Sequence, residues 1–148
     1  METRSRKKVS SKHLIFLTVS GALVFWIASF VTSLLPIAAE YRAAYDNWSM
    51  QTVWVGAVFA GLLFGFLVSF FLLKGGHSTS VKRPLLRAVL LSLCALVVAT
   101  LLIDLPHARQ AHENVLHYFW IGVMFNTIRF VLLGVAIGLA YRVFRVNR

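Results

Sequence analysis

Four long apolar segments constrain this chain more than any other feature. About 20 consecutive apolar residues cross the hydrocarbon core of a bilayer as a helix, and four segments reach that length, at 14–39, 52–73, 85–103 and 115–140. Of the 148 residues, 59% are hydrophobic and 14% are charged. This composition leaves too few polar residues to cover four such segments as the core of a soluble protein. Lipid offers no partners to backbone polar groups, so helices are expected in all four. The sequence predicts an all-α integral membrane protein, folded as a four-transmembrane-helix bundle in a single membrane domain over 1–148.

The first apolar segment follows the basic tail 1–13, an order that also occurs in secretory signal peptides. Its apolar run of about 26 residues exceeds the roughly 7–15 of a signal core. We therefore expect a retained first helix. Cleavage near "PIAAE" is the alternative, and it would leave three spans.

The basic residues are unevenly distributed between the two sides of such a bundle. Twelve of the 15 lie in or beside the amino-terminal tail, the second connection and the carboxyl-terminal tail 141–148, namely Arg4, Arg6, Lys7, Lys8, Lys12, Lys74, Lys82, Arg83, Arg87, Arg142, Arg145 and Arg148. The first and third connections hold four of the five acids, namely Glu40, Asp46, Asp104 and Glu113. The positive-inside rule then predicts that both termini are cytoplasmic. This topology, together with anionic lipid headgroups, accounts for the net charge of +10, so no nucleic-acid partner is expected.

The two halves of the chain resemble one another. "SSKH" at 10–13 matches "SVKR" at 80–83, and Leu-Pro at 35–36 matches Leu-Pro at 105–106. After a gap of four residues, "WVGAVF" at 54–59 matches "WIGVMF" at 120–125. These matches suggest two tandem helical hairpins related as a parallel repeat, with chance similarity between apolar segments as the alternative. In this alignment Ala60 corresponds to Asn126 and Leu63 to Arg129.

Small residues recur at helical spacing in two of the segments. The stripes comprise Ala57, Gly61, Gly65 and Ser69 in the second segment and Gly134 and Gly138 in the fourth. Such stripes let helix backbones approach closely in lipid, where no hydrophobic force drives helices together. They predict a compact bundle and a possible dimer face.

The fourth segment carries a charge at its centre, in "FNTIRFVLLG" at 125–134. Arg129 lies near mid-depth, and burying it there costs roughly 2.5–3.5 kcal/mol on insertion scales, so it needs protein, water or a partner around it. Asp104 is the first candidate partner and Glu40 the second. Three interpretations stay open: a structural arginine, a contact with an acidic partner subunit, or an anion pocket formed with Asn126.

The stretch "EYRAAYDNW" follows the first apolar segment. It places Tyr41, Tyr45 and Trp48 at helical spacing beside Arg42 and Asp46, a composition that suits an amphipathic turn at the outer interface. We expect an aromatic anchor, and a binding loop is the alternative.

Catalytic and metal-binding patterns are weak. Cys94 is the single cysteine, so no internal thiol pair exists. His107, His112 and His117 are spaced by five residues and cannot share one helical face. A metal-dependent enzyme using these histidines is therefore the least favoured hypothesis, and we expect no enzyme activity, no metal and no cofactor.

These observations favour a small membrane protein that acts through intramembrane helix contacts, as an accessory, assembly or regulatory subunit. Its expected partners are the lipid bilayer and either another membrane protein or a second copy of the chain. The alternative is a small dimeric transporter or channel that contacts an anionic solute through Asn126 and Arg129.

Overall fold

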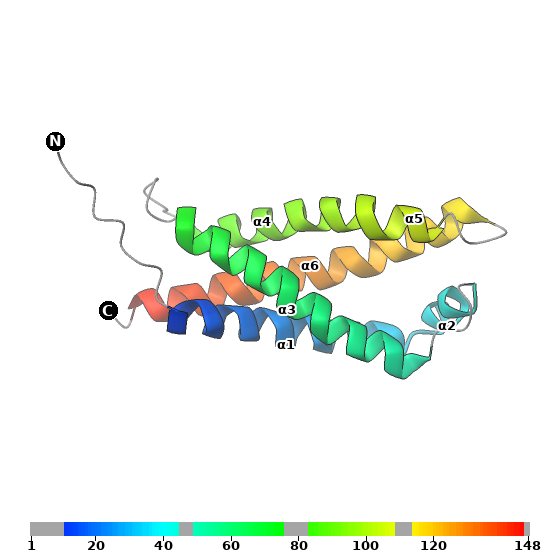
Figure 1. Ribbon diagram of the computed structural model, residues 1–148, viewed down its shortest axis with the longest axis horizontal. Helices are drawn as coiled ribbons and strands as arrows, with labels where there is room; N and C mark the ends of the chain where they lie inside the picture. The colour runs from blue at the N-terminus through cyan, green and yellow to red at the C-terminus, as the bar shows by residue number, and fades with distance from the viewer. Residues whose placement is uncertain (1–10, 45–48, 76–82, 109–113, 147–148) are drawn as a thin grey trace.

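A computed structural model describes residues 11–44, 49–75, 83–108 and 114–146 of the chain. These residues are helical, with no strand among them, and four long apolar helices run along the molecule (Figure 1). The long helices are α1 (Ser11–Ser33), α3 (Met50–Gly75), α4 (Pro84–Ala99) and α6 (Val115–Val146). Each of them, α4 together with the turn that extends it to Asp104, is long and apolar enough to cross a membrane. The predicted all-α four-helix membrane bundle is thus confirmed.

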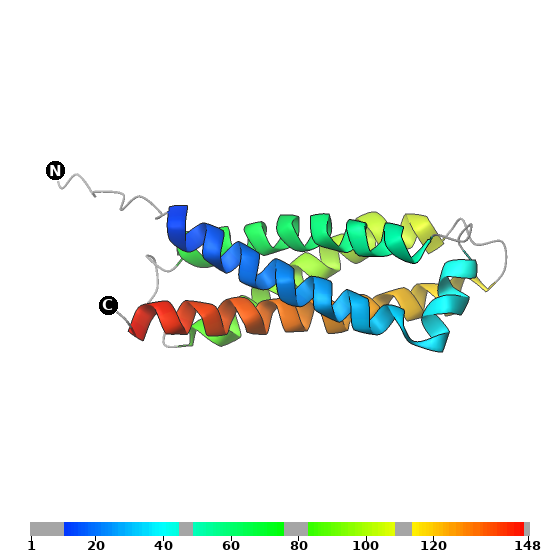
Figure 2. The ribbon, with the colours of Figure 1, turned by 90° about the horizontal axis from the view of Figure 1, so that it is seen from below.

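The helices pack as two antiparallel pairs, α1 with α3 and α4 with α6, and α1 also packs along α6. Helix α1 begins and α6 ends at the same end of the bundle, which we call the terminal end, and α2 (Pro36–Ala43) marks the opposite α2 end (Figures 1 and 2). Helices α3 and α4 approach at the terminal end, where Arg87 Nη1 donates to the Gly75 carbonyl at 2.7 Å. They separate toward the α2 end (Figure 1).

The first apolar segment is divided, so the helix predicted over 14–39 ends at Ser33. Proline has no N–H and disfavours a helical residue before it. Leu35 is accordingly extended, with ψ 142°, and Pro36 occupies the first turn of a new helix, α2. As a result α2 turns away from the direction of α1 at that end of the bundle (Figure 2).

The third long helix widens before it ends. Helix α4 passes into a π-helical turn, η1 (Thr100–Asp104), and then into the short α5 (Leu105–Ala108). The Leu105 N–H donates to the Thr100 carbonyl, five residues back. The wider turn stands directly before Pro106, whose ring would clash with a carbonyl four residues earlier in a regular α-helix. The helix thus continues past residue 103, the predicted end of the span.

The predicted small-residue stripes lie between helices of the same chain. A side chain at Gly65 would meet the Thr18 carbonyl of α1 at 2.9 Å, and one at Gly138 would meet Leu85 Cα of α4 at 2.8 Å. Gly61 and Gly134 face the same two neighbouring helices. Ala57 and Ser69 are also buried. The four glycines therefore close the two helix pairs, and none of the six positions forms an exposed face.

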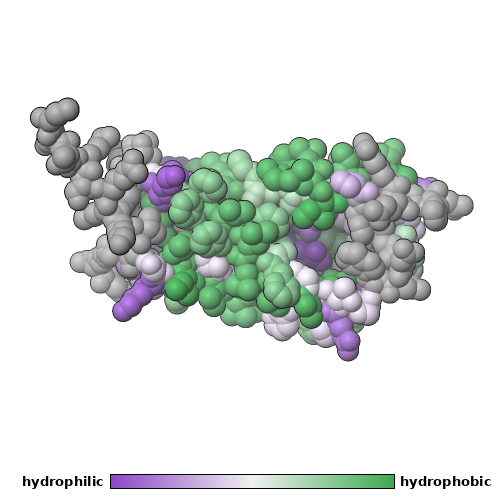
Figure 3. All heavy atoms as spheres, in the orientation of Figure 1, coloured by the Kyte–Doolittle hydropathy of each residue, from purple (hydrophilic) through white to green (hydrophobic). Residues whose placement is uncertain are grey.

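The half of the bundle nearest the terminal end has a continuous apolar core. Its fully buried side chains are Leu17, Val68, Leu72, Ala88, Leu133 and Ile137. The outside of the bundle is apolar as well, and Figure 3 shows hydrophobic residues covering the middle of the molecule. One hydrophilic patch interrupts this apolar band, where α6 lies behind the space between α3 and α4.

Candidate functional site

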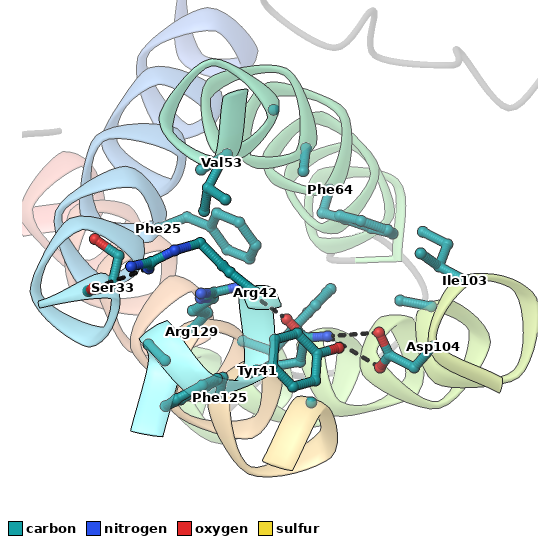
Figure 4. Close-up of a pocket in the computed structure, with 18 of the residues that line it drawn as sticks. Phe25, Ser33, Tyr41, Arg42, Val53, Phe64, Ile103, Asp104, Phe125 and Arg129 are labelled. Atoms are coloured by element: carbon teal, nitrogen blue, oxygen red, sulfur yellow. Dashed lines mark hydrogen bonds between the residues drawn. The ribbon is translucent and has the colours of Figure 1, made fainter. Parts of the chain in front are cut away.

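A cavity of about 310 Å³ lies in the half of the bundle nearest the α2 end. Helix α6 contributes Gly122, Phe125, Asn126, Arg129 and Phe130 to its lining, and the other walls come from α1, α2, α3, the last residue of α4 and η1 (Figure 4). Helix α2 contributes Ala38, Tyr41 and Arg42 at the α2 end of the cavity. The hydrophilic patch of Figure 3 thus coincides with a hollow inside the apolar band.

A chain of hydrogen bonds crosses the cavity between three helices. Asn126 Nδ2 donates to both carboxylate oxygens of Asp104, each at 2.9 Å. Arg129 Nη1 donates to Asn126 Oδ1 at 3.2 Å, and Nη2 donates to Thr32 Oγ1 of α1, also at 3.2 Å. The Asn126 side chain thereby links Arg129 to Asp104, because its Nδ2 donates to the carboxylate and its Oδ1 accepts from the guanidinium.

Local helix geometry brings these groups together. Asn126 and Arg129 are three residues apart, so they share one face of α6. Asp104 closes the π-helical turn and is only 8% exposed, whereas Leu102 in the same turn is 71% exposed. The extra residue in a π-turn changes the direction in which the following side chains point. It therefore turns Asp104 into the bundle.

The cavity carries more positive than negative charge. Two guanidinium groups line it, Arg42 and Arg129, against the single carboxylate of Asp104. Arg42 Nη1 donates to the Ser33 carbonyl at 3.1 Å, which holds α2 against the end of α1. Among the described residues, the lining thus carries one more positive than negative charge.

Arg129 has hydrogen-bonding capacity to spare. A guanidinium offers five N–H donors, and within the described part of the chain Arg129 uses two of them. Its Nε is buried and has no hydrogen-bond partner there. Its Cζ lies 5.9 Å from the centre of the Phe125 ring, a cation–π contact. The Arg129 guanidinium can therefore donate hydrogen bonds to a carboxylate or phosphate and keep its existing bonds.

Three aromatic rings close the cavity toward the terminal end. Phe130 of α6 contacts Phe25 of α1 edge-on, with ring centroids 5.5 Å apart, and Phe64 of α3 at 4.8 Å. All three line the cavity, and the apolar core of the bundle begins behind them. The cavity is therefore a chamber and not a continuous pore.

The structure separates the two acids considered as partners of Arg129. Asp104 belongs to the same hydrogen-bond network, connected through Asn126. Glu40 lies elsewhere, with its Oε1 3.6 Å from His117 Nε2 and both side chains 56% exposed. Glu40 thus sits at the surface of the α2 end and does not line the cavity.

The other candidates lie apart from the cavity. Cys94 is exposed on α4, and His107 falls in α5. His112, Tyr45, Asp46 and Trp48 lie outside the described residues, as do the ends of both tails. In the described ranges no three histidine, cysteine or acidic side chains gather as metal ligands.

Sequence reasoning missed the contribution of α2. Tyr41 and Arg42 were expected in an interfacial anchor, but Figure 4 shows both side chains over the cavity that contains Arg129. The signal that could have found them is Pro36, because a helix broken there can direct the following turn back over the bundle. No sequence pattern around Thr32 indicates that it contacts Arg129.

Comparison of the chain with protein-family models, curated proteins and solved structures returns no match. The function must therefore be inferred from the cavity itself.

Proposed function

We propose that this is an integral membrane protein that binds a small molecule carrying an anionic group in the cavity, as the solute site of a small carrier. The observation that carries the proposal is Arg129, which has three N–H donors without a partner among the described residues and lines a cavity of about 310 Å³ within the bundle. A purely structural arginine needs partners but no adjacent volume. Intramembrane ionisable groups that face a cavity typically mark a solute or ion site.

The charge balance supports an anion as the solute. Asp104 offsets one of the two guanidinium charges and is itself occupied by Asn126. A singly charged anion would neutralise the rest. Because the chamber ends at Phe25, Phe64 and Phe130, a carrier that changes conformation fits better than an open channel.

The sidedness of the site follows from the basic residues. Lys74, Arg83, Arg87 and Arg142 lie in the described residues at or near the terminal end. We therefore place that end in the cytoplasm and the cavity in the outer half of the membrane. Reporter fusions at Arg148 and at Asp46 should give opposite signals, and the same compartment for both would contradict this orientation.

The accessory-subunit interpretation remains the alternative. The glycine stripes, which were expected as a contact face, pack inside the chain, while large apolar side chains stay exposed on the outside of the bundle. The cavity is also lined by residues of one chain, so the proposed site does not require a dimer.

Anion binding by the purified protein tests the proposal. In nonionic detergent, benzoate, octanoate and inorganic phosphate should be screened for a rise in the thermal unfolding temperature. At least one should stabilise the natural protein, and Arg129→Leu should abolish the effect. Arg129→Lys should restore only part of it, because an ammonium group lacks the planar fork of the guanidinium.

Gly56→Leu provides a second, independent variant. Gly56 lines the cavity, and an added Cβ would meet nothing within 4 Å, so a larger side chain can fill the space without a packing clash. This variant should keep its unfolding temperature and lose anion binding. Stabilisation that survives in both Gly56→Leu and Arg129→Leu would overturn the proposed site, as would a panel in which no anion binds.

A further inference from the structure

We infer that the occupant of the cavity is a single-chain amphiphile with an anionic head, a carboxylate or a phosphate, and that it enters sideways from the bilayer between α3 and η1. This inference rests on the proposed function and specifies its ligand. The anionic head would contact Arg129, and the apolar chain would lie against the aromatic and aliphatic walls.

The position of the opening is the first argument. Helix α2 covers the cavity at the α2 end, and the three phenylalanines close it toward the terminal end. The hydrophilic patch is instead visible from the side, within the apolar band of Figure 3. A molecule that enters there must come through the hydrocarbon, and a free hydrated ion in hydrocarbon is strongly disfavoured.

The rim of this opening is the second argument. On α3 three small residues, Gly56, Ala57 and Ala60, line the cavity between the larger Val53 and Phe64. Across the opening stands Ile103 of η1, which lines the cavity and is also 56% exposed. Small residues on one side and an exposed aliphatic side chain on the other leave space for a hydrocarbon chain that passes between them.

The third argument is that the cavity lining has a polar part and an apolar part. The polar groups Arg42, Asp104, Asn126 and Arg129 share this lining with the apolar side chains of Val53, Phe64 and Ile103. The hydrogen bonds of Asn126 connect Arg129 to Asp104. An amphiphile presents the same division. A volume of about 310 Å³ is at the small end of ligand pockets, which suits a head and the first part of a chain whose remainder stays in lipid.

Photocrosslinking in phosphatidylcholine nanodiscs tests this inference. One probe is hexadecanoate with a diazirine in its chain, and the other is the hexadecanol of the same chain, which has no charge. The carboxylate should label peptides of α3 and η1 about tenfold more than the alcohol, because a charge-assisted bond to a guanidinium distinguishes the two heads. A hexadecyl phosphate without diazirine should compete, whereas acetate and inorganic phosphate should not.

Two variants connect the labelling to the cavity. Gly56→Leu should lose the labelling by occupying the space, and Arg129→Leu should make the two probes label equally. Leu63→Ile is the matched control, since Leu63 lies on the exposed face of the same helix at 56% exposure. It should label as the natural protein does. If Arg129→Leu does not fold, Gly56→Leu still decides the outcome.

The possible failures are distinguishable. If acetate or inorganic phosphate binds in an Arg129-dependent way while the two long-chain probes label equally, the proposed anion site stands and the amphiphile is wrong. If neither soluble anions nor the carboxylate probe depend on Arg129 or Gly56, both are wrong. Preferential carboxylate labelling confined to the cavity peptides would support both.

Discussion

The two hairpins, α1 with α3 and α4 with α6, contribute differently to one cavity. In the sequence alignment Gly56 corresponds to Gly122 and Phe64 to Phe130, and all four line the cavity, the two phenylalanines in ring contact. Corresponding positions of the two halves thus meet around the same chamber. The tandem repeat itself stays a prediction.

The hairpins differ where the cavity is polar. Ala60 in the first hairpin corresponds to Asn126 in the second, and both line the cavity. Leu63 corresponds to Arg129, but Leu63 is 56% exposed while Arg129 turns inward. The comparison teaches that a shared helical scaffold provides the chamber and that the second hairpin provides both charges of the network that joins Asp104, Asn126 and Arg129.

The two prolines show a second difference. Pro36 ends α1 early and starts α2, which brings Tyr41 and Arg42 over the cavity. Pro106 is accommodated instead by the π-helical turn, which brings in Asp104. A proline at corresponding positions thus gives a helix break in one half and a π-helical turn in the other, and each places a charged side chain in the cavity lining.

The largest expected effect concerns the packing that both hairpins share. Gly65→Leu in the first hairpin and Gly138→Leu in the second should each lower the unfolding temperature in detergent by about 10 °C, because overpacking against a backbone costs roughly 3 kcal/mol or more. Added side chains there meet Thr18 and Leu85 closely. Leu63→Ile should leave stability unchanged. Equal tolerance of all three changes would mean that the helix pairs do not pack as described.

An intermediate effect on stability is expected when Asn126 is replaced by alanine, the residue at the corresponding position 60 of the first hairpin. Asn126→Ala leaves the buried Asp104 without its amide donor and Arg129 without one acceptor. Loss of a hydrogen bond to a buried charged group should cost about 1–3 kcal/mol in unfolding free energy. Thr127→Val is the control, since within the described ranges the Thr127 hydroxyl donates to the Val123 carbonyl of its own helix and to no other helix. A similar small loss in both variants would argue against a bridging role for Asn126.

The regular parts of this fold could be predicted from the sequence, and the irregular parts could not. Apolar length fixed the four helices, and the glycine spacing indicated which faces pack. The pairing of Asp104 with Arg129 could be suggested from their opposite charges alone. The π-helical turn that places Asp104 inside the bundle was not predicted from the sequence. The bridging amide of Asn126 depends on how helices meet, so it could not be predicted from the sequence. Pro36 indicates a break after the first helix, but it does not show that the next turn places Tyr41 and Arg42 over the cavity.

The smallest effect on stability should come from Arg129→Leu, which gives the second hairpin the residue of the first. It removes a costly intramembrane charge and leaves the bonds between Asn126 and Asp104 in place. The net change in unfolding free energy should therefore stay within about 1 kcal/mol, since loss of two hydrogen bonds is offset by loss of the insertion cost and Arg42 remains in the lining as a counter-charge to Asp104. Ligand binding should nevertheless disappear. Unfolding in detergent and anion binding must be measured on the same preparation. A variant that fails to insert or fold would show that Arg129 organises the bundle, and its assignment to ligand binding would then be abandoned.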